Sequence, residues 1–215
     1  MSRRLSRDEA WDLLTEWVSS PSLLRHCLAV ETAMRAYAER FGEDAELWSV
    51  VGLLHDMDYE RYPDLETGHP RHAIAELERR DVDPVIVRGI ASHADFLGVP
   101  RESLMEKTLY AVDELSGFIL AVAAVRPDGL RGLTAKSVKK KLKQPSFAAA
   151  VNREDVRRGA EELGVDFDEH VAFVAAALEA RSDALAGASP DEDGGPRHTA
   201  ARAQEARLPG STPAG

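Results

Sequence analysis

Residues 50–59 read VVGLLHDMDY, and they give the clearest indication of a helical core. The first five residues, Val50 to Leu54, are apolar on nearly every side of a helix, so this segment is expected to be buried. His55 and Asp56 follow directly, which carries a histidine and a carboxylate towards the interior together. Because an isolated buried carboxylate is costly, the doublet predicts a polar site within a helical core.

The sequence around this stretch has helical periodicity over nearly all of residues 7–182. Pro21 after Ser20, Asp44, Pro70, the pair Asp83-Pro84 and Pro100 before Ser103 are typical helix starts. Four predicted helices cover about residues 20–41, 103–125, 153–163 and 168–182. Three more are predicted to begin at about residues 44, 70 and 83. Alternating β patterns of useful length are missing, so the sequence predicts an all-α domain.

Histidines and acids lie on the predicted inward faces of these helices. His26 falls between Leu23 and Val30, His93 continues the stripe of Ile86 and Ile90, and Asp113 follows Leu109 by four residues. Together with His55 and Asp56 they come from four helices. A divalent metal is the shared solution, because imidazole nitrogen and carboxylate oxygen are its ordinary ligands and can converge from separate helices of a bundle.

Each of these residues also has a simpler interpretation. A single histidine on an apolar face is usually a core histidine with satisfied hydrogen bonds. His55 and Asp56 could be a surface pair, since neighbours on a helix point about 100° apart. Asp113 could pair with Lys107 or with an arginine, as buried carboxylates usually do.

The order His26, then Leu53-Leu54-His55-Asp56, then Asp113 resembles the H…HD…D motif of the HD-domain metal-dependent phosphohydrolases. The resemblance covers about residues 20–125, and it implies a single HD-type helical bundle. It also implies that these four residues hold one divalent metal, with Asp56 bridging to a second ion in the two-metal members.

The stretch Gly68-His69-Pro70-Arg71-His72 resembles the segment with a His-Pro pair that follows the doublet in two-metal members. By this resemblance His69 and His93 hold the second ion, with His72 as an alternative to His69. Two features differ from the family pattern. Met57, Asp58 and Tyr59 follow the doublet where several branches have a small apolar residue, Gly and Lys, and Ala94 replaces a second adjacent histidine.

The chemistry implied is hydrolysis at phosphorus. Two metals about 3.5–4 Å apart can activate water and clamp a phosphoryl group. Histidine ligands suit Mn, Fe, Co, Ni or Zn better than Mg. Asp58, Tyr59 and Glu114 adjoin ligands in sequence and are candidates for the acid that serves the leaving group. Asp56 and Asp58 are the predicted catalytic residues.

A phosphorylated substrate requires positive charge. Residues 136–143 read KSVKKKLK, five lysines in eight residues of a chain with a net charge of −10. This segment is either a solvated helix face or a contact for substrate phosphate or single-stranded nucleic acid. Lys136, Lys139 and Lys140 are the predicted phosphate-binding residues. Arg25, Arg61 and Arg71 are further candidates.

Composition sets the remaining expectations for the 215 residues. One domain, residues 1–186, is expected to be followed by a disordered tail, residues 187–215, which has five Gly, four Pro and no aromatic residue. Cys27 is the only cysteine, which favours a reducing cytoplasm. The longest apolar run, residues 117–125, is too short for a membrane span, which needs about 20 residues. The acidic balance argues against broad affinity for duplex nucleic acid.

The sequence therefore predicts a phosphohydrolase acting on a nucleotide or a related small phosphate, with one or two divalent ions as cofactor. Two other classes stay open. One is a non-catalytic regulatory module that keeps the metal site or binds RNA through the lysines. The other is a di-iron oxygenase, since a few HD-type folds bind redox-active iron.

Overall fold

The computed structural model describes residues 2–186, and this part of the chain is all-α, as predicted. In chain order the helices are α1 (Arg7–Trp17), α2 (Pro21–Phe41), α3 (Ala45–Leu54), α4 (Arg71–Arg79), α5 (Pro84–Ser92), the 3₁₀ helix η1 (Asp95–Leu97), α6 (Leu104–Ala124), α7 (Ala135–Leu142), α8 (Arg153–Leu163), α9 (Phe167–Ala180) and α10 (Ser182–Ala186). Within residues 2–186 the only β-type pairing is an isolated bridge between Arg3 and Val82. The predicted disordered tail lies outside the described residues.

The helices begin where the sequence predicts. Ser20 accepts a hydrogen bond from the Leu23 backbone, with Pro21 opening α2. Asp44 caps α3 by accepting from two backbone N–H groups of its first turn. Ser103 caps α6 in a reciprocal capping box with Glu106. These side chains satisfy backbone donors that have no partner within the helix, and such a cap typically contributes about 1 kcal/mol.

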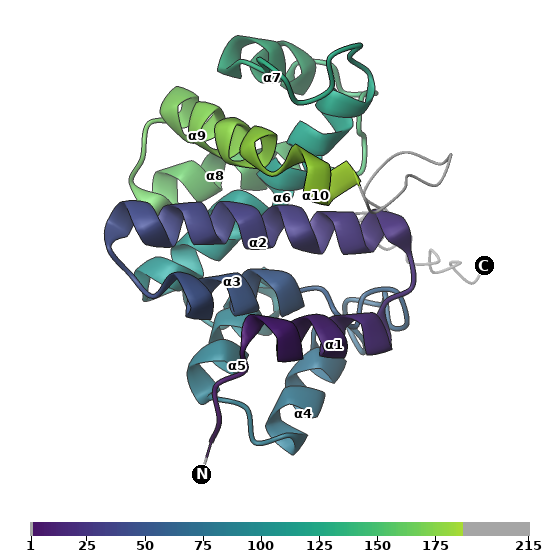
Figure 1. Ribbon diagram of the computed structural model, residues 1–215, viewed down its shortest axis with the longest axis vertical. Coiled ribbons are helices and arrows are strands. Elements are labelled where there is room, and N and C mark those ends of the chain that lie inside the picture. The colour runs from purple at the N-terminus through teal and green to yellow at the C-terminus, as the bar shows by residue number, and fades with distance from the viewer. Residues whose placement is uncertain (1, 187–215) are drawn as a thin grey trace, which may run out of the picture.

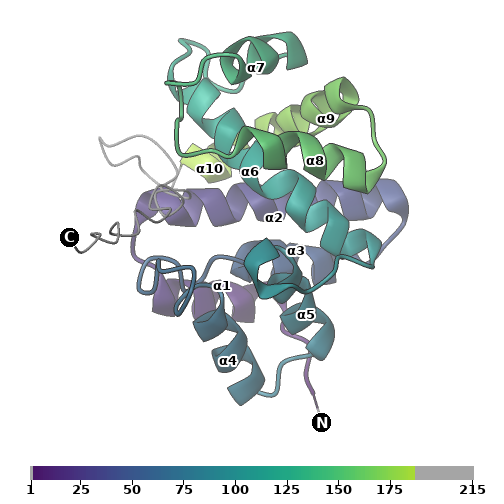
Figure 2. The same cartoon turned by 180° about the vertical axis from the view of Figure 1, so that it is seen from behind.

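Two long helices organise the fold. Helix α2 crosses the middle of the molecule, with α1, α3, α4 and α5 on one side and α7 to α10 on the other (Figure 1). From behind, α6 runs obliquely between α8 and α3 (Figure 2). Helix α2 packs most extensively against α3, and α6 packs most extensively against α8. The buried faces of α2, α3, α5 and α6 therefore surround one interior region.

The second half departs slightly from the predicted boundaries. The predicted helix 168–182 is α9, which begins at Phe167, ends at Ala180 and is followed by the short α10. The lysine segment forms α7, whose buried side chains are Val138 and Leu142. Among the described residues, none of the helices has both the length and the apolar character needed to cross a membrane.

Candidate metal centre

The His-Asp doublet reaches the interior through the close packing of α3 on α2. A Cβ atom on Gly52 would lie only 3.1 Å from the Glu31 Cα, so glycine allows the two helix backbones to approach. Helix α3 ends at Leu54, and His55 follows as its C-cap residue. The close approach places His55 opposite His26, which projects from the buried face of α2. Both histidines are buried.

The four residues predicted for the first ion come together. The Nε2 atoms of His26 and His55 are 3.2 Å apart. The Oδ1 atom of Asp113 lies 3.1 Å from His26 Nε2 and 3.4 Å from His55 Nε2. The Oδ2 atom of Asp56 lies 3.6 Å and 3.5 Å from the same two nitrogens. Asp113 therefore lies beside the histidines and not beside Lys107.

The other oxygen of Asp56 faces a second histidine pair. The Nε2 atoms of His69 and His93 are 3.2 Å apart. The Asp56 Oδ1 atom lies 3.4 Å from His69 Nε2 and 3.7 Å from His93 Nε2. Two groups of buried ligand atoms thus share Asp56, each compact enough to hold one metal ion. His72 takes no part, because its ring stacks on Tyr62 with centroids 3.7 Å apart.

The hydrogen bonds behind the histidines show that the cluster fits a metal. His55 Nδ1 lies 2.8 Å from the Gly52 carbonyl oxygen, and His93 Nδ1 lies 2.5 Å from the Ile90 carbonyl oxygen. A carbonyl only accepts, so each Nδ1 donates, and a neutral ring then has a lone pair on Nε2. His69 Nδ1 is bound in the same way, 2.8 Å from Asp58 Oδ1. Metal-binding histidines characteristically have this second contact.

The packing of His69 against His93 strengthens that fit. With both Nδ1 atoms donating, the two neutral rings direct Nε2 lone pairs at each other across 3.2 Å. Unless one ring takes up a proton, neither nitrogen can donate to the other, and a cation near both of them and near Asp56 would satisfy both lone pairs. The structure thus supplies the donor set that a divalent ion requires.

The ionisation of the cluster follows from its burial and its acids. Burial opposes a charge on His55, but Asp56 and Asp113 outweigh it and raise the pKa of His55 to about 9. Burial also disfavours ionised Asp113, but His55 and His26 hold its pKa well below the usual value. Burial, together with His69 and His55, lowers the pKa of His93 to about 4. The acids thus favour positive charge at His55.

Asp58 lies behind the site, so the prediction that it is catalytic needs correction. Its side chain is fully buried, and one oxygen accepts from His69 Nδ1 at 2.8 Å. The other oxygen accepts from the Ala73 backbone N–H at 2.8 Å. Both oxygens are occupied, and Asp58 does not line the cavity beside the histidines. It orients His69.

A cavity of about 470 Å³ opens beside the cluster, where His69, His93, Asp56 and Asp113 line it. Tyr59 and Glu114, which the sequence offered as acid candidates, both line it. Burial, Asp113 and Asp155 raise the pKa of Glu114 to about 9, and burial, Asp56 and Glu114 raise the pKa of Tyr59 to about 12. Both side chains therefore keep a proton at neutral pH in the metal-free protein.

The lysine segment lies elsewhere, which corrects the predicted phosphate contact. Lys136, Lys139 and Lys140 are on α7, at the far end of the molecule from α4 and α5 (Figure 1), and none of them lines the cavity. The Lys139 Nζ atom is paired with Asp168 of α9 at 2.7 Å. Of the arginine candidates, Arg61 donates to the Glu16 carbonyl and Arg71 to the Leu65 carbonyl.

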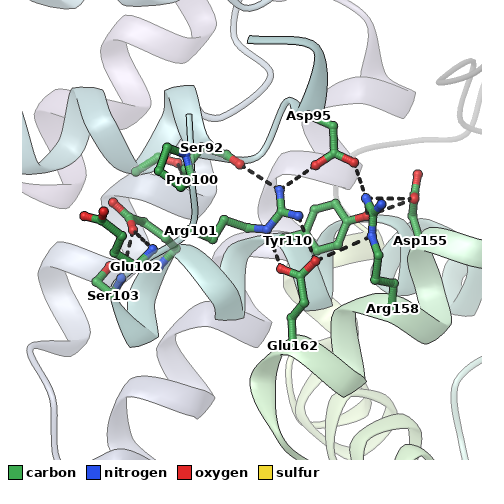
Figure 3. Close-up of polar contacts among 12 residues, drawn as sticks. Ser92, Asp95, Pro100, Arg101, Glu102, Ser103, Tyr110, Asp155, Arg158 and Glu162 are labelled. Carbon is green, nitrogen blue, oxygen red and sulfur yellow. Dashed lines mark hydrogen bonds and ion pairs between the residues drawn. The ribbon is translucent and has the colours of Figure 1, made fainter. Parts of the chain in front are cut away.

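Sequence reasoning missed the polar wall on the opposite side of the cavity. Arg158 of α8 contacts Asp95 and the Tyr110 hydroxyl, and it lies 3.3 Å from Asp155 Oδ1 (Figure 3). Arg101 holds the other oxygen of Asp95 at 2.7 Å. The only signal in the sequence is local: Asp155 and Arg158 are spaced as neighbours on one helix face. Nothing in that spacing points to η1 or α6.

Comparison with known proteins agrees with this geometry. The sequence model of the HD domain family matches residues 23–117, from the first turn of α2 into the middle of α6. The match includes His26, the His55-Asp56 doublet and Asp113, as well as His69 and His93. Neither the curated proteins nor the solved structures contain a match to the chain. In sequence, residues 23–117 are therefore similar to an HD domain.

Proposed function

We propose that the protein is a phosphohydrolase that uses divalent metal to hydrolyse a phosphoester or phosphoanhydride of a nucleotide or a related small phosphate. The observation that carries this proposal is the position of Asp56. Each of its oxygens faces a different pair of histidine Nε2 atoms, at 3.4–3.7 Å. A carboxylate in that position would suit two adjacent ions, and Asp56, His69, His93 and Asp113 line one cavity.

Bound at these residues, divalent ions would activate water for attack at phosphorus and offset the charge of the phosphoryl oxygens. The chain itself performs the positioning. The Gly52 and Ile90 carbonyls and the Asp58 carboxylate fix three imidazole rings with Nε2 facing inward. Asp113 and Asp56 add negative charge where a cation is needed, and the buried surroundings keep that charge weakly screened.

Six residues would hold the metal. His26, His55, Asp56 and Asp113 form the first site, and Asp56, His69 and His93 form the second. The histidine-rich set favours Mn, Fe, Co, Ni or Zn over Mg. Hydrolysis forms a bond between phosphorus and the water oxygen and breaks the bond to the leaving oxygen. A water proton passes to the leaving group, so no oxidant or reductant is consumed.

The test is loading with metal followed by a phosphate screen. The full chain is loaded anaerobically with Mn or Fe, and released inorganic phosphate is measured over mononucleotides, dinucleotides and sugar or alkyl phosphates. We expect release by the native protein and none by His55→Ala. His72→Ala is the matched control, because His72 belongs to the same segment as His69 but stacks on Tyr62. It should retain metal and activity.

Other results would identify a different function. Bound metal without phosphate release from any compound would indicate a regulatory module. Oxygen consumption by the iron-loaded protein, with no phosphate released, would indicate an oxygenase.

A further inference from the structure

Arg101 binds the chain on both sides of His93. Its Nη1 atom donates to the Ser92 carbonyl oxygen at 3.1 Å and to Asp95 Oδ1 at 2.7 Å (Figure 3). His93 lies between these two acceptors in the sequence, as the C-cap residue of α5. The last carbonyl groups of a helix have no partner within the helix, and the guanidinium satisfies the one at Ser92. A single nitrogen atom thus brackets the turn that carries His93.

The rest of the Arg101 side chain is fixed by two other helices. Its Nε and Nη2 atoms donate to the two carboxylate oxygens of Glu162 on α8, at 2.7 Å and 2.9 Å. Its guanidinium lies over the Tyr110 ring of α6, 3.7 Å from the ring centroid. The side chain is only 9% exposed, and Asp95 is itself held by Arg158 of α8 (Figure 3). A planar guanidinium with both edges occupied in this way has little freedom to move.

The bracketed turn decides where the imidazole of His93 lies. His93 Nδ1 is bonded to the Ile90 carbonyl oxygen of the same turn, so the ring and the turn move together. His93 Nε2 lies 3.7 Å from Asp56 Oδ1, across the space between the ligand atoms of the second group. Metal–ligand distances vary by only about 0.2 Å, so a small displacement of the turn would remove this ligand.

We infer that Arg101 is a positioning residue for the second metal ion and that Glu162 of α8 helps to fix it. The inference rests on the proposed function, which places a second ion at Asp56, His69 and His93. Arg101 does not line the cavity, so it acts on the site through the turn that it holds. The sequence match to the HD family ends at residue 117, whereas α8 begins at Arg153. The second ion site therefore depends on a helix that lies beyond that match.

The test is a chelator-competition titration of the full chain with Mn, which resolves two binding steps. Arg101→Ala should raise the Kd of the second step about tenfold, the low end of the loss for a contact that supports a metal-binding histidine. The first step should not change, because His26, His55 and Asp113 do not depend on this turn. An unchanged second step in Arg101→Ala would overturn the inference.

Two further variants test how Arg101 acts. Arg101→Lys keeps the charge but loses the planar fork, so its second step should resemble that of Arg101→Ala more than that of the native protein. A native second step in Arg101→Lys would show that charge alone is sufficient and would contradict the bracketing role. Glu162→Gln should raise the second Kd by about threefold, as expected for a partly exposed ion pair. No change in Glu162→Gln would contradict the role of α8.

A general loss of stability has to be distinguished from this effect. Arg7→Ala is the matched control, because Arg7 forms the same two-bonded pair with Glu31, at 2.9 Å and 3.1 Å, between α1 and α2. It should lower Tm and leave the second binding step unchanged. If Arg7→Ala weakens the second step as much as Arg101→Ala does, general destabilisation explains both results and the inference is refuted.

Hydrogen exchange of the metal-free protein gives a readout that is independent of metal. Arg101→Ala should speed amide exchange in peptides that cover residues 90–98, because the junction of α5 and η1 loses its anchor. Peptides of α2 around His26 should exchange as in the native protein. Unchanged exchange over residues 90–98 would contradict the positioning role.

Failure of the proposed function would look different. Two binding steps with the expected effect of Arg101→Ala, but no phosphate release from any compound, would refute the phosphohydrolase and support the positioning role. A single ion in the native protein would refute the positioning role, even if that ion supports phosphate release.

Discussion

Asp58 accepts a hydrogen bond from Nδ1 of His69 at 2.8 Å, and this contact leaves Nε2 as the ring nitrogen that points to the metal centre. The second Asp58 oxygen is held by the Ala73 backbone N–H, so the carboxylate is anchored to the first turn of α4. The aspartate two residues after the doublet is thus a support for the second ion. Its sequence position resembles that of a catalytic acid, but its side chain points away from the cavity.

Asp58→Asn should weaken the second ion specifically. The amide can still accept from Ala73, but its NH₂ group would then face His69 Nδ1 and favour the tautomer with a proton on Nε2. Loss of such a supporting contact typically costs about 10–100-fold in metal affinity. Competition titration with a metal chelator should show a weaker second binding step and an unchanged first step. Equal weakening of both steps would show that Asp58 supports the whole centre.

Metal stoichiometry should distinguish the shared ligand from the unshared ones. We expect about two ions per chain in the native protein and about one in His93→Ala, since His93 belongs only to the second group of ligand atoms. Asp56→Ala should lose both ions, because each Asp56 oxygen serves a different group. Elemental analysis after anaerobic loading measures this. Circular dichroism should show that all variants remain helical. One ion in both the native protein and His93→Ala would rule out the paired site.

The sequence was sufficient for the features that depend on local rules. Helix starts at Pro21, Asp44, Asp83 and Ser103 follow from capping chemistry and are confirmed. The all-α class follows from the periodicity of the apolar residues. The convergence of His26 with the doublet could be predicted because buried polar residues on several helices need a common partner.

The features that the sequence did not predict depend on tertiary packing, which the periodicity of apolar residues does not encode. Asp58 follows the doublet by two residues, but the turn after α3 directs it to α4 instead of the cavity. The lysines of α7 looked suited to phosphate because charge density along a chain carries no information on distance from a site. Arg158 reaches the cavity only because α8 packs closely on α6, which no residue near the doublet indicates.

The packing of α8 on α6 gives a prediction for stability. A Cβ atom on Gly159 would lie 2.6 Å from the Ala111 Cα atom, so the two helices touch through this glycine. Gly159→Ala should therefore destabilise the protein by about 1–3 kcal/mol. For a chain of this size each kcal/mol lowers Tm by roughly 2–4 °C. Intrinsic helix propensity predicts the opposite sign, a gain of up to about 1 kcal/mol. A raised Tm in scanning calorimetry would refute the close contact. Arg157→Ala, at an exposed position of the same helix, should leave Tm nearly unchanged.

The metal-free protein should lose stability as pH rises from about 6.5 to about 9. The pKa of His55 is raised from 6.5 to about 9, with Asp56 and Asp113 outweighing burial. The folded state therefore holds a proton that the unfolded chain releases, so this stabilisation is complete below pH 6.5 and is lost through pH 9.

Glu114 acts in the same direction, because burial and Asp113 raise its pKa from 4.5 to about 9. Urea unfolding in the presence of a chelator should show a decrease on the order of 3 kcal/mol from each of the two groups over this range. Glu114→Gln should remove part of the slope, since the amide does not titrate. Loading with Mn should remove the part due to His55, because a metal at Nε2 replaces the proton. A slope that is the same with and without metal would contradict the placement of His55 in the centre.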